Sequence, residues 1–119
     1  MDFDHFSVAL LIARPDAPLL SAEEEAALQD AHLNHLATLH EAGQLAAAGP
    51  LQGGPGSGYR GLSILTVPVE QATALAQADP AVIAGRFSVQ VMPWMVPAGA
   101  VLFGQALFPH SAAQARGGA

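Results

Sequence analysis

The sequence predicts an α+β fold in one compact domain, and three observations support this prediction. Apolar residues recur at every second position in two segments, 6–12 and 86–92, as in strands that place one face on a core. Between them, an apolar stripe with helical spacing runs through residues 21–42. The chain has 119 residues, which is enough for one modest hydrophobic core.

The N-terminal part is predicted to form a strand and then a long helix. The strand covers Phe6–Ile12 and ends before the proline-rich segment Arg14–Pro18, because proline removes donors from a strand ladder. Ser21 and Glu24 then fit a capping box, in which each side chain bonds the backbone N–H of the other residue. The helix should run from there to about residue 42, with Gly43 as its stop.

The two faces of this helix differ in character. At about 100° per residue, one face is mainly apolar but includes two histidines. Its members are Leu28, His32, His35, Leu36 and Leu39, and the residues opposite are Asp30, Asn34, Ala37 and Glu41. His32 is the first candidate functional residue, because this polar residue interrupts an otherwise apolar stripe.

The second half of the chain repeats the strand and helix signals. We predict a short strand at Leu45–Gly49, a glycine-rich loop at Gln52–Tyr59, a strand at Gly61–Val67, a helix at Val69–Ala78 and a strand at Arg86–Met92. Asp79-Pro80 should end the second helix, and Pro93-Trp94 should close the last strand. The loop is not followed by Gly-Lys-Ser or Gly-Lys-Thr, so it is interpreted as a flexible connection and not as a phosphate cradle.

The resulting order, β-α-β-β-α-β, is typical of a ferredoxin-like fold with both helices on one face of the sheet. The other face still carries apolar residues, so we expect a homodimer in which a second sheet covers it. We divide the chain into a ferredoxin-like domain at 1–96 and a C-terminal arm and tail at 97–119. The apolar segment Met95–Phe108 is predicted to form an added edge strand at Ala100–Phe103 or an arm on the partner subunit. Ser111–Ala119 is expected to be a disordered tail or one without structural weight.

Composition excludes several classes of function. The net charge is −6, lysine is absent and only four arginines are present, so nucleic acid is not an expected partner. The absence of cysteine excludes disulfides and thiolate metal sites and fits a cytoplasmic protein. The N-terminal MDFDHF lacks the basic region of a signal peptide, and no apolar run reaches the roughly 20 residues of a membrane span. No organic cofactor is indicated.

Several short segments of the chain occur in the order typical of one protein family. They are Ala31-His32-Leu33, Leu39-His40-Glu41-Ala42-Gly43-Gln44-Leu45, Gly49-Pro50, Arg60-Gly61, Ala78-Asp79-Pro80 and Ala84-Gly85. With these segments the chain resembles the YciI-like (YCII-related) proteins from about Phe6 to Trp94. The resemblance implies a dimeric α+β barrel of ferredoxin-like subunits, with an active site built from His32 and Asp79. One branch of that family removes chloride from a chlorinated hydroxyquinol, so the resemblance includes dehydrohalogenase or other lyase chemistry among the expectations.

Together with the resemblance, His32 and Asp79 predict a catalytic dyad for general acid/base chemistry on a small molecule. Histidine is the side chain best suited to exchanging protons at neutral pH. A carboxylate that bonds one ring nitrogen fixes the tautomer and leaves the other nitrogen free as the base. Each residue also has a structural interpretation, as a buried histidine satisfied by one hydrogen bond and as an aspartate that ends a helix before proline.

Other residues extend this site or compete with it. His35 lies one turn along the helix from the first histidine and is a candidate for substrate binding. Alternatively, the two histidines bind a metal ion, with Asp79 or His5 as a third ligand. Arg60 and Arg86 are candidates for holding an anionic substrate, because guanidinium groups match carboxylates.

The favoured hypothesis is therefore a small homodimeric enzyme with lyase- or hydrolase-type chemistry, in which Asp79 orients His32. The alternative is a non-catalytic small-molecule-binding or regulatory dimer, in which the histidine only hydrogen-bonds a ligand. A third class is a structural interaction module. A pH-dependent rate indicates the enzyme, and ligand-induced stabilisation without turnover indicates the binding protein. A filled, dry site indicates the structural module.

Overall fold

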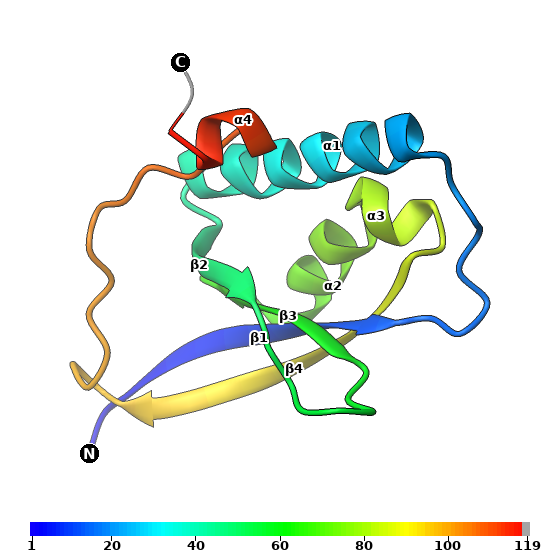
Figure 1. Cartoon of the computed structure of the whole chain (residues 1–119). Coiled ribbons are helices and arrows are strands. Elements are labelled where there is room, and N and C mark those ends of the chain that lie inside the picture. The colour runs from blue at the N-terminus through cyan, green and yellow to red at the C-terminus, as the bar shows by residue number, and fades with distance from the viewer. Residues whose placement is uncertain (118–119) are drawn as a thin grey trace.

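The computed structural model describes residues 1–117, and its elements form two layers (Figure 1). The strands are β1 (Phe3–Ala13), β2 (Leu45–Pro50), β3 (Tyr59–Leu65) and β4 (Phe87–Pro97); the helices are α1 (Ala22–Glu41), α2 (Val69–Gln77), α3 (Pro80–Ile83) and α4 (Ala112–Ala115). The strands pair in the order β2-β3-β1-β4, and every pair is antiparallel. All four helices lie on one face of this sheet (Figure 1). The predicted ferredoxin-like α+β fold is confirmed.

Helix α1 begins at the predicted capping box. The Ser21 hydroxyl accepts a hydrogen bond from the backbone N–H of Glu24 (3.1 Å), and the Glu24 carboxylate accepts one from the backbone N–H of Ser21 (3.0 Å). The Ser21 N–H lowers the pKa of Glu24, because it stabilises the ionised form. Gly43 follows the helix with φ of +77°, a conformation that favours glycine. No helix within residues 1–117 has both the length and the apolar character needed to cross a membrane.

The hydrophobic core lies between the helices and one face of the sheet. Its buried members are Ala9, Leu39, Leu45, Leu65 and Ala72. On β1, the small side chains of Ser7 and Ala9 are buried on this face, and the Ser7 hydroxyl donates to the Val67 carbonyl at 2.7 Å. Small residues at these positions let the helices lie close to the sheet.

The alternating apolar residues of β1 point to the opposite face, which corrects the expectation that they contact the core within one subunit. Successive side chains of a strand point to opposite faces, so Phe6, Val8, Leu10 and Ile12 share the face that has no helices. Trp94 of β4 is paired with Phe6, and Ile64 of β3 is paired with Val8, so both lie on that face. This face, which no helix covers and on which Phe103 packs edge-on against Phe6, is called the uncovered face and is therefore apolar.

Strand β4 is longer than predicted. It does not close at Pro93-Trp94 but pairs with β1 as far as Pro97, which lies opposite Phe3. Proline is compatible with this position because β4 is an edge strand and needs only one of its sides for pairing. Ala100–Phe103 does not form the added edge strand, since the chain has no strand after Pro97 within the described residues.

The C-terminal segment, residues 105–117, returns to the helix layer and lies along α1 (Figure 1). His110 bonds Asn34 and Glu41 of α1, each at 2.6 Å, and the backbone N–H of Ala112 donates to the Asp30 carboxylate at 2.8 Å. These bonds occupy the face of α1 that lies opposite its apolar stripe, and Ala37 on that face is completely buried. The expectation of a tail without structural weight is therefore wrong for residues 111–117; Gly118 and Ala119 lie outside the described residues.

Candidate active site

A cavity of about 550 Å³ opens between α1, the sheet and the C-terminal segment. This volume is within the usual range for small-molecule sites. Its lining is mainly apolar and includes Leu33 and Leu36 of α1, Phe87 at the start of β4, and Phe108 of the C-terminal segment. Its polar side chains are those of Gln29, His32, Arg60, Ser63 and Arg116.

His32 of α1 lies in the wall of this cavity and is hydrogen-bonded to Asp79. The distance from its Nδ1 to Oδ2 of Asp79 is 2.7 Å. The two side chains are largely withdrawn from solvent, with 13% of the histidine and 3% of the aspartate exposed. A bond of this length at such low exposure holds the imidazole in one orientation.

The fold of the Asp-Pro step explains why Asp79 is available at this point. Asp79 is the N-cap of α3, and its Oδ1 accepts a hydrogen bond from the backbone N–H of Ala81 at 2.9 Å. Pro80 occupies the first position of α3, where its missing N–H is not needed. One carboxylate oxygen therefore caps the helix while the other bonds the histidine, and the helix dipole favours the negative charge at its N-terminus.

This geometry assigns different roles to the two nitrogens of His32. An ionised carboxylate only accepts hydrogen bonds, so Nδ1 carries the proton that is shared with Asp79. The neutral ring then has Nε2 as an unprotonated acceptor, and the ring lines the cavity. Such an arrangement can take a proton from a bound molecule, and the carboxylate can stabilise the resulting imidazolium.

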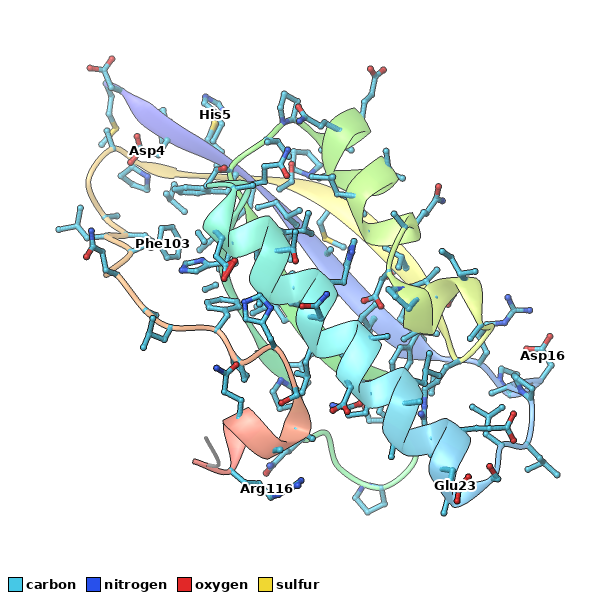
Figure 2. The ribbon with its side chains drawn as sticks, turned by 90° about the horizontal axis from the view of Figure 1, so that it is seen from above. Asp4, His5, Asp16, Glu23, Phe103 and Arg116 are labelled. Atoms are coloured by element: carbon cyan, nitrogen blue, oxygen red, sulfur yellow. The ribbon has the colours of Figure 1, made fainter. Side chains whose placement is uncertain are left out.

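His35, the other histidine on this face of α1, does not reach the cavity. Its Nε2 is 2.9 Å from the carbonyl oxygen of Leu75, which only accepts, so the ring donates and links α1 to α2. His5 is also absent from the lining, and Figure 2 shows it near the N-terminal end of β1, away from Arg116 and α4. Within residues 1–117, no group of three or more His, Cys, Asp or Glu side chains is arranged to hold a metal ion.

The two arginines considered for substrate binding lie in different places. Arg60 lines the cavity, and its Nη1 donates to the carbonyls of Ser57 (2.6 Å) and Tyr59 (3.1 Å). Arg86 is not part of the lining and forms an ion pair with Glu25 of α1 instead.

The contribution of the C-terminal segment to this cavity was not predicted from the sequence. Five lining residues come from it, namely Phe108, Pro109, Ala112, Ala115 and Arg116. Phe108 is held by stacking on His40, with ring centroids 4.0 Å apart and planes inclined by 12°. A sequence signal was present, because Ser111 and Gln114 have the spacing of a capping box. The Ser111 hydroxyl accepts from the Gln114 N–H at 3.1 Å and so starts α4.

The solved structures that resemble this fold include the following two. The first is the 5-chloro-2-hydroxyhydroquinone dehydrochlorinase TftG from Burkholderia phenoliruptrix AC1100, in complex with 2,5-dihydroxybenzoquinone. It has a TM-score of 0.55 and 21% identity, over 75% of this chain and 92% of that chain. The second is At3g17210 from Arabidopsis thaliana, with a TM-score of 0.41 and 17% identity, over 82% of this chain and 99% of that one. At these identities the first likeness shows the fold alone, and the second is too weak to support an argument.

Sequence comparison identifies a family but no individual relative. No curated protein matches the chain. The YCII-related domain matches residues 6–95, a region that contains His32, Arg60 and Asp79 but ends before the C-terminal segment. Because the match covers most of the chain, this protein belongs to the YCII-related domain family.

Proposed function

We propose that this protein is a small-molecule enzyme in which His32 is the general acid/base and Asp79 positions it. The observation that carries the proposal is the 2.7 Å bond between these side chains in the wall of a cavity of about 550 Å³. A histidine with only a structural role needs no open space beside its second nitrogen. Here the ring borders a cavity with room for a small organic molecule.

The chemistry that fits this geometry starts with proton transfer to Nε2. In an elimination, Nε2 takes a proton from a substrate carbon, the C–H electron pair becomes the new double bond, and the leaving group departs with its own electron pair. In a hydrolysis, Nε2 takes a proton from water as the water oxygen bonds an electrophilic carbon, and the bond from that carbon to the leaving group then breaks with its electron pair going to the leaving group. In both cases Asp79 stabilises the imidazolium, and Nε2 then returns the proton to the leaving group or to solvent.

The Burkholderia structure suggests which reaction to assay first. That protein is named as a dehydrochlorinase, and loss of hydrogen chloride is an elimination of the kind just described. We therefore propose lyase-type chemistry as the first class to test and hydrolysis as the second.

The uncovered face of the sheet supports a homodimer as the working form of this enzyme. Trp94 is 36% exposed, Met92 is 39% exposed and Tyr59 is 48% exposed in the isolated chain. Large apolar residues on one sheet face are usually buried against another layer. We propose that two copies pack these faces together, and analytical ultracentrifugation of the full chain tests this directly.

The first experiment determines the protonation of His32 and needs no substrate. Long-range ¹H–¹⁵N NMR spectra of the imidazoles should show His32 as the Nδ1–H tautomer near neutral pH. An Nε2–H tautomer would contradict the proposed base, because the nitrogen proposed to accept the proton would then already carry one.

The second experiment tests turnover. The purified protein is incubated with 5-chloro-2-hydroxyhydroquinone and with a panel of small esters and halogenated phenols, and chloride or acid release is measured. We expect activity that changes with pH in the range where histidine titrates and that His32→Gln abolishes. Ligand-induced stabilisation with no turnover across the panel would instead favour a non-catalytic binding protein.

A further inference from the structure

The charges that line the cavity differ in sign from the charge of the whole protein. The chain carries a net charge of −6, yet its cavity lining contains two arginines, one histidine and no aspartate or glutamate. Asp79 stands behind His32 and is not itself part of the lining. A cationic site in an acidic protein attracts an anion and repels cations from the same opening.

The four arginines divide into two pairs. Arg14 is bonded to the Asp16 carboxylate, and Arg86 is paired with Glu25. Arg60 and Arg116 form no ion pair with an acidic side chain within residues 1–117, and both line the cavity. Among residues 1–117, the arginines without an acidic side-chain partner are thus the two at the candidate site.

Arg60 and Arg116 come from segments that are distant in sequence. Arg60 lies in β3, where the carbonyls of Ser57 and Tyr59 hold its Nη1 and leave Nη2 and Nε without a partner in the described residues. Arg116 follows α4, which the bond between Ala112 and Asp30 fixes to α1 (Figure 2). Two guanidinium groups on one cavity offer the paired N–H donors that match the oxygens of a carboxylate.

From these observations we propose that Arg60 and Arg116 form a carboxylate-binding subsite, and that the ligand of this cavity is a small organic acid with an apolar body. The apolar body would contact Leu33, Leu36 and Phe108, while the carboxylate is held at the arginines. This inference depends on the proposed function in one respect only, which is that the reacting atoms of the ligand lie beside His32. It adds a residue, Arg116, from outside the region that matches the family.

A carboxylate fits this subsite better than a phosphate does. Phosphate sites usually include free backbone N–H groups at a helix N-terminus. In the cavity-lining helix α4, the N–H of Ala112 bonds Asp30 and the N–H of Gln114 bonds Ser111, so these two groups are not available to an anion. The arginine side chains on the cavity are those of Arg60 and Arg116.

The test compares 2-naphthoate with 2-naphthamide, which has nearly the same shape but no charge. Affinities are measured by calorimetry for the wild type, Arg60→Gln, Arg116→Gln and the double variant. We expect the wild type to bind the carboxylate at least about tenfold more tightly than the amide, and each single variant to lose about tenfold of the carboxylate affinity. Amide binding should change by less than about twofold in the same variants.

Matched controls make this result interpretable. Arg14→Gln removes an arginine outside the cavity and should leave both affinities unchanged, and Arg60→Lys should recover part of the carboxylate affinity because it restores a charge. The proposal is overturned if the wild type does not prefer the carboxylate, if neither arginine variant weakens it, or if 2-naphthyl phosphate binds more tightly than 2-naphthoate.

A separate variant distinguishes failure of this inference from failure of the proposed function. His32→Gln should keep its preference for 2-naphthoate over 2-naphthamide, because the arginines that cause the preference are untouched. If His32→Gln also keeps full turnover, the acid/base proposal fails while the ligand class stands. If the wild type shows no preference for 2-naphthoate but His32→Gln abolishes turnover, the proposed ligand class fails while the acid/base proposal stands.

Discussion

His32 and His35 lie three residues apart on the same helix, and each uses one ring nitrogen to bond the α2–α3 region. His32 bonds the carboxylate of Asp79, whereas His35 bonds the backbone carbonyl of Leu75. Both lie on the same face of α1, so the sequence pattern alone does not indicate which of the two histidines is functional. What differs is the chemical nature of the partner and the space beside the ring.

Both differences favour a chemical role for His32. A carboxylate can balance the positive charge of an imidazolium, whereas a peptide carbonyl is neutral and only orients the ring. The cavity beside His32 measures about 550 Å³, and the one beside His35 measures about 20 Å³, room for little more than a water molecule. The comparison shows that a histidine becomes a candidate catalyst through its partner and its access, and not through its place in an apolar stripe.

The largest expected effect separates these two histidines directly. His32→Gln should lower kcat/KM for any substrate found by about 10²- to 10⁴-fold, the range typical of a lost general base. His35→Gln should lower it by less than about tenfold but reduce the free energy of unfolding by about 1–2 kcal/mol, because the link to Leu75 is weakened. Steady-state kinetics and urea unfolding of both variants check this. Equal loss of activity in the two variants would contradict a catalytic role that His32 has and His35 lacks.

Asp79→Asn tests the role of the carboxylate that bonds His32 and leaves the imidazole ring in place. The asparagine oxygen can still cap Ala81, but its NH₂ group would then face Nδ1 of His32 and force that nitrogen to accept. The proton moves to Nε2 and blocks the base, so kcat should fall by about 10²-fold or more. Long-range ¹H–¹⁵N NMR should show the change of tautomer. A variant that keeps the Nδ1–H tautomer and full activity would refute the positioning role.

Phe108→Ala tests the access to His32. The ring lines the cavity and stacks on His40, so its removal should reduce the free energy of unfolding by about 1–3 kcal/mol and loosen this wall. KM should rise more than kcat falls, because binding is impaired while the dyad stays intact. Leu107→Ala is the matched control, since Leu107 is 100% exposed and its removal should change stability by less than about 0.5 kcal/mol.

The smallest effect concerns the start of the helix that carries both histidines. Ser21→Ala removes the acceptor for the Glu24 N–H and should cost about 1 kcal/mol of stability, with kcat/KM unchanged. The folded pKa of Glu24 is lowered, so its carboxylate stabilises the fold above the unfolded pKa, and this contribution is lost as the pH falls through the folded pKa. Glu24→Gln should therefore be less stable than the wild type at pH 7, and the difference should vanish in acid. Thermal unfolding of the wild type and both variants, measured from pH 7 into the acid range, checks these differences in stability.

Much of the fold was predictable because its signals are local. The capping box at Ser21, the glycine stop at Gly43 and the Asp79-Pro80 helix end all act within one turn of the chain, and the structure has each of them. Strand β4 was predicted too short because its end is set by pairing with β1, which continues as far as Pro97. No residue pattern within β4 indicates where that pairing ends. For the same reason, the alternation in Phe6–Ile12 predicted a strand but not which of its faces the helices would cover.

The candidate site was predictable only in part. His32 and Asp79 were identified as a pair through the family resemblance, since they are 47 positions apart and the sequence contains no measure of their separation in space. The sequence made Arg60 and Arg86 equally good candidates for substrate binding. Only the structure places Arg60 in the cavity lining and Arg86 against Glu25. Arg116 was overlooked because its segment was interpreted as a tail.

By itself, the sequence determined the β-α-β-β-α-β order of the main elements, without the short helices α3 and α4, and the kinds of side chain available for chemistry. These follow from periodicity, capping and turn residues, which depend on neighbours along the chain. Only the tertiary structure decided which histidine receives a carboxylate, which arginines remain without a partner and which segment closes the cavity. Those outcomes depend on distances between segments far apart in sequence, and these distances are set by how the helices and the C-terminal segment pack on the sheet.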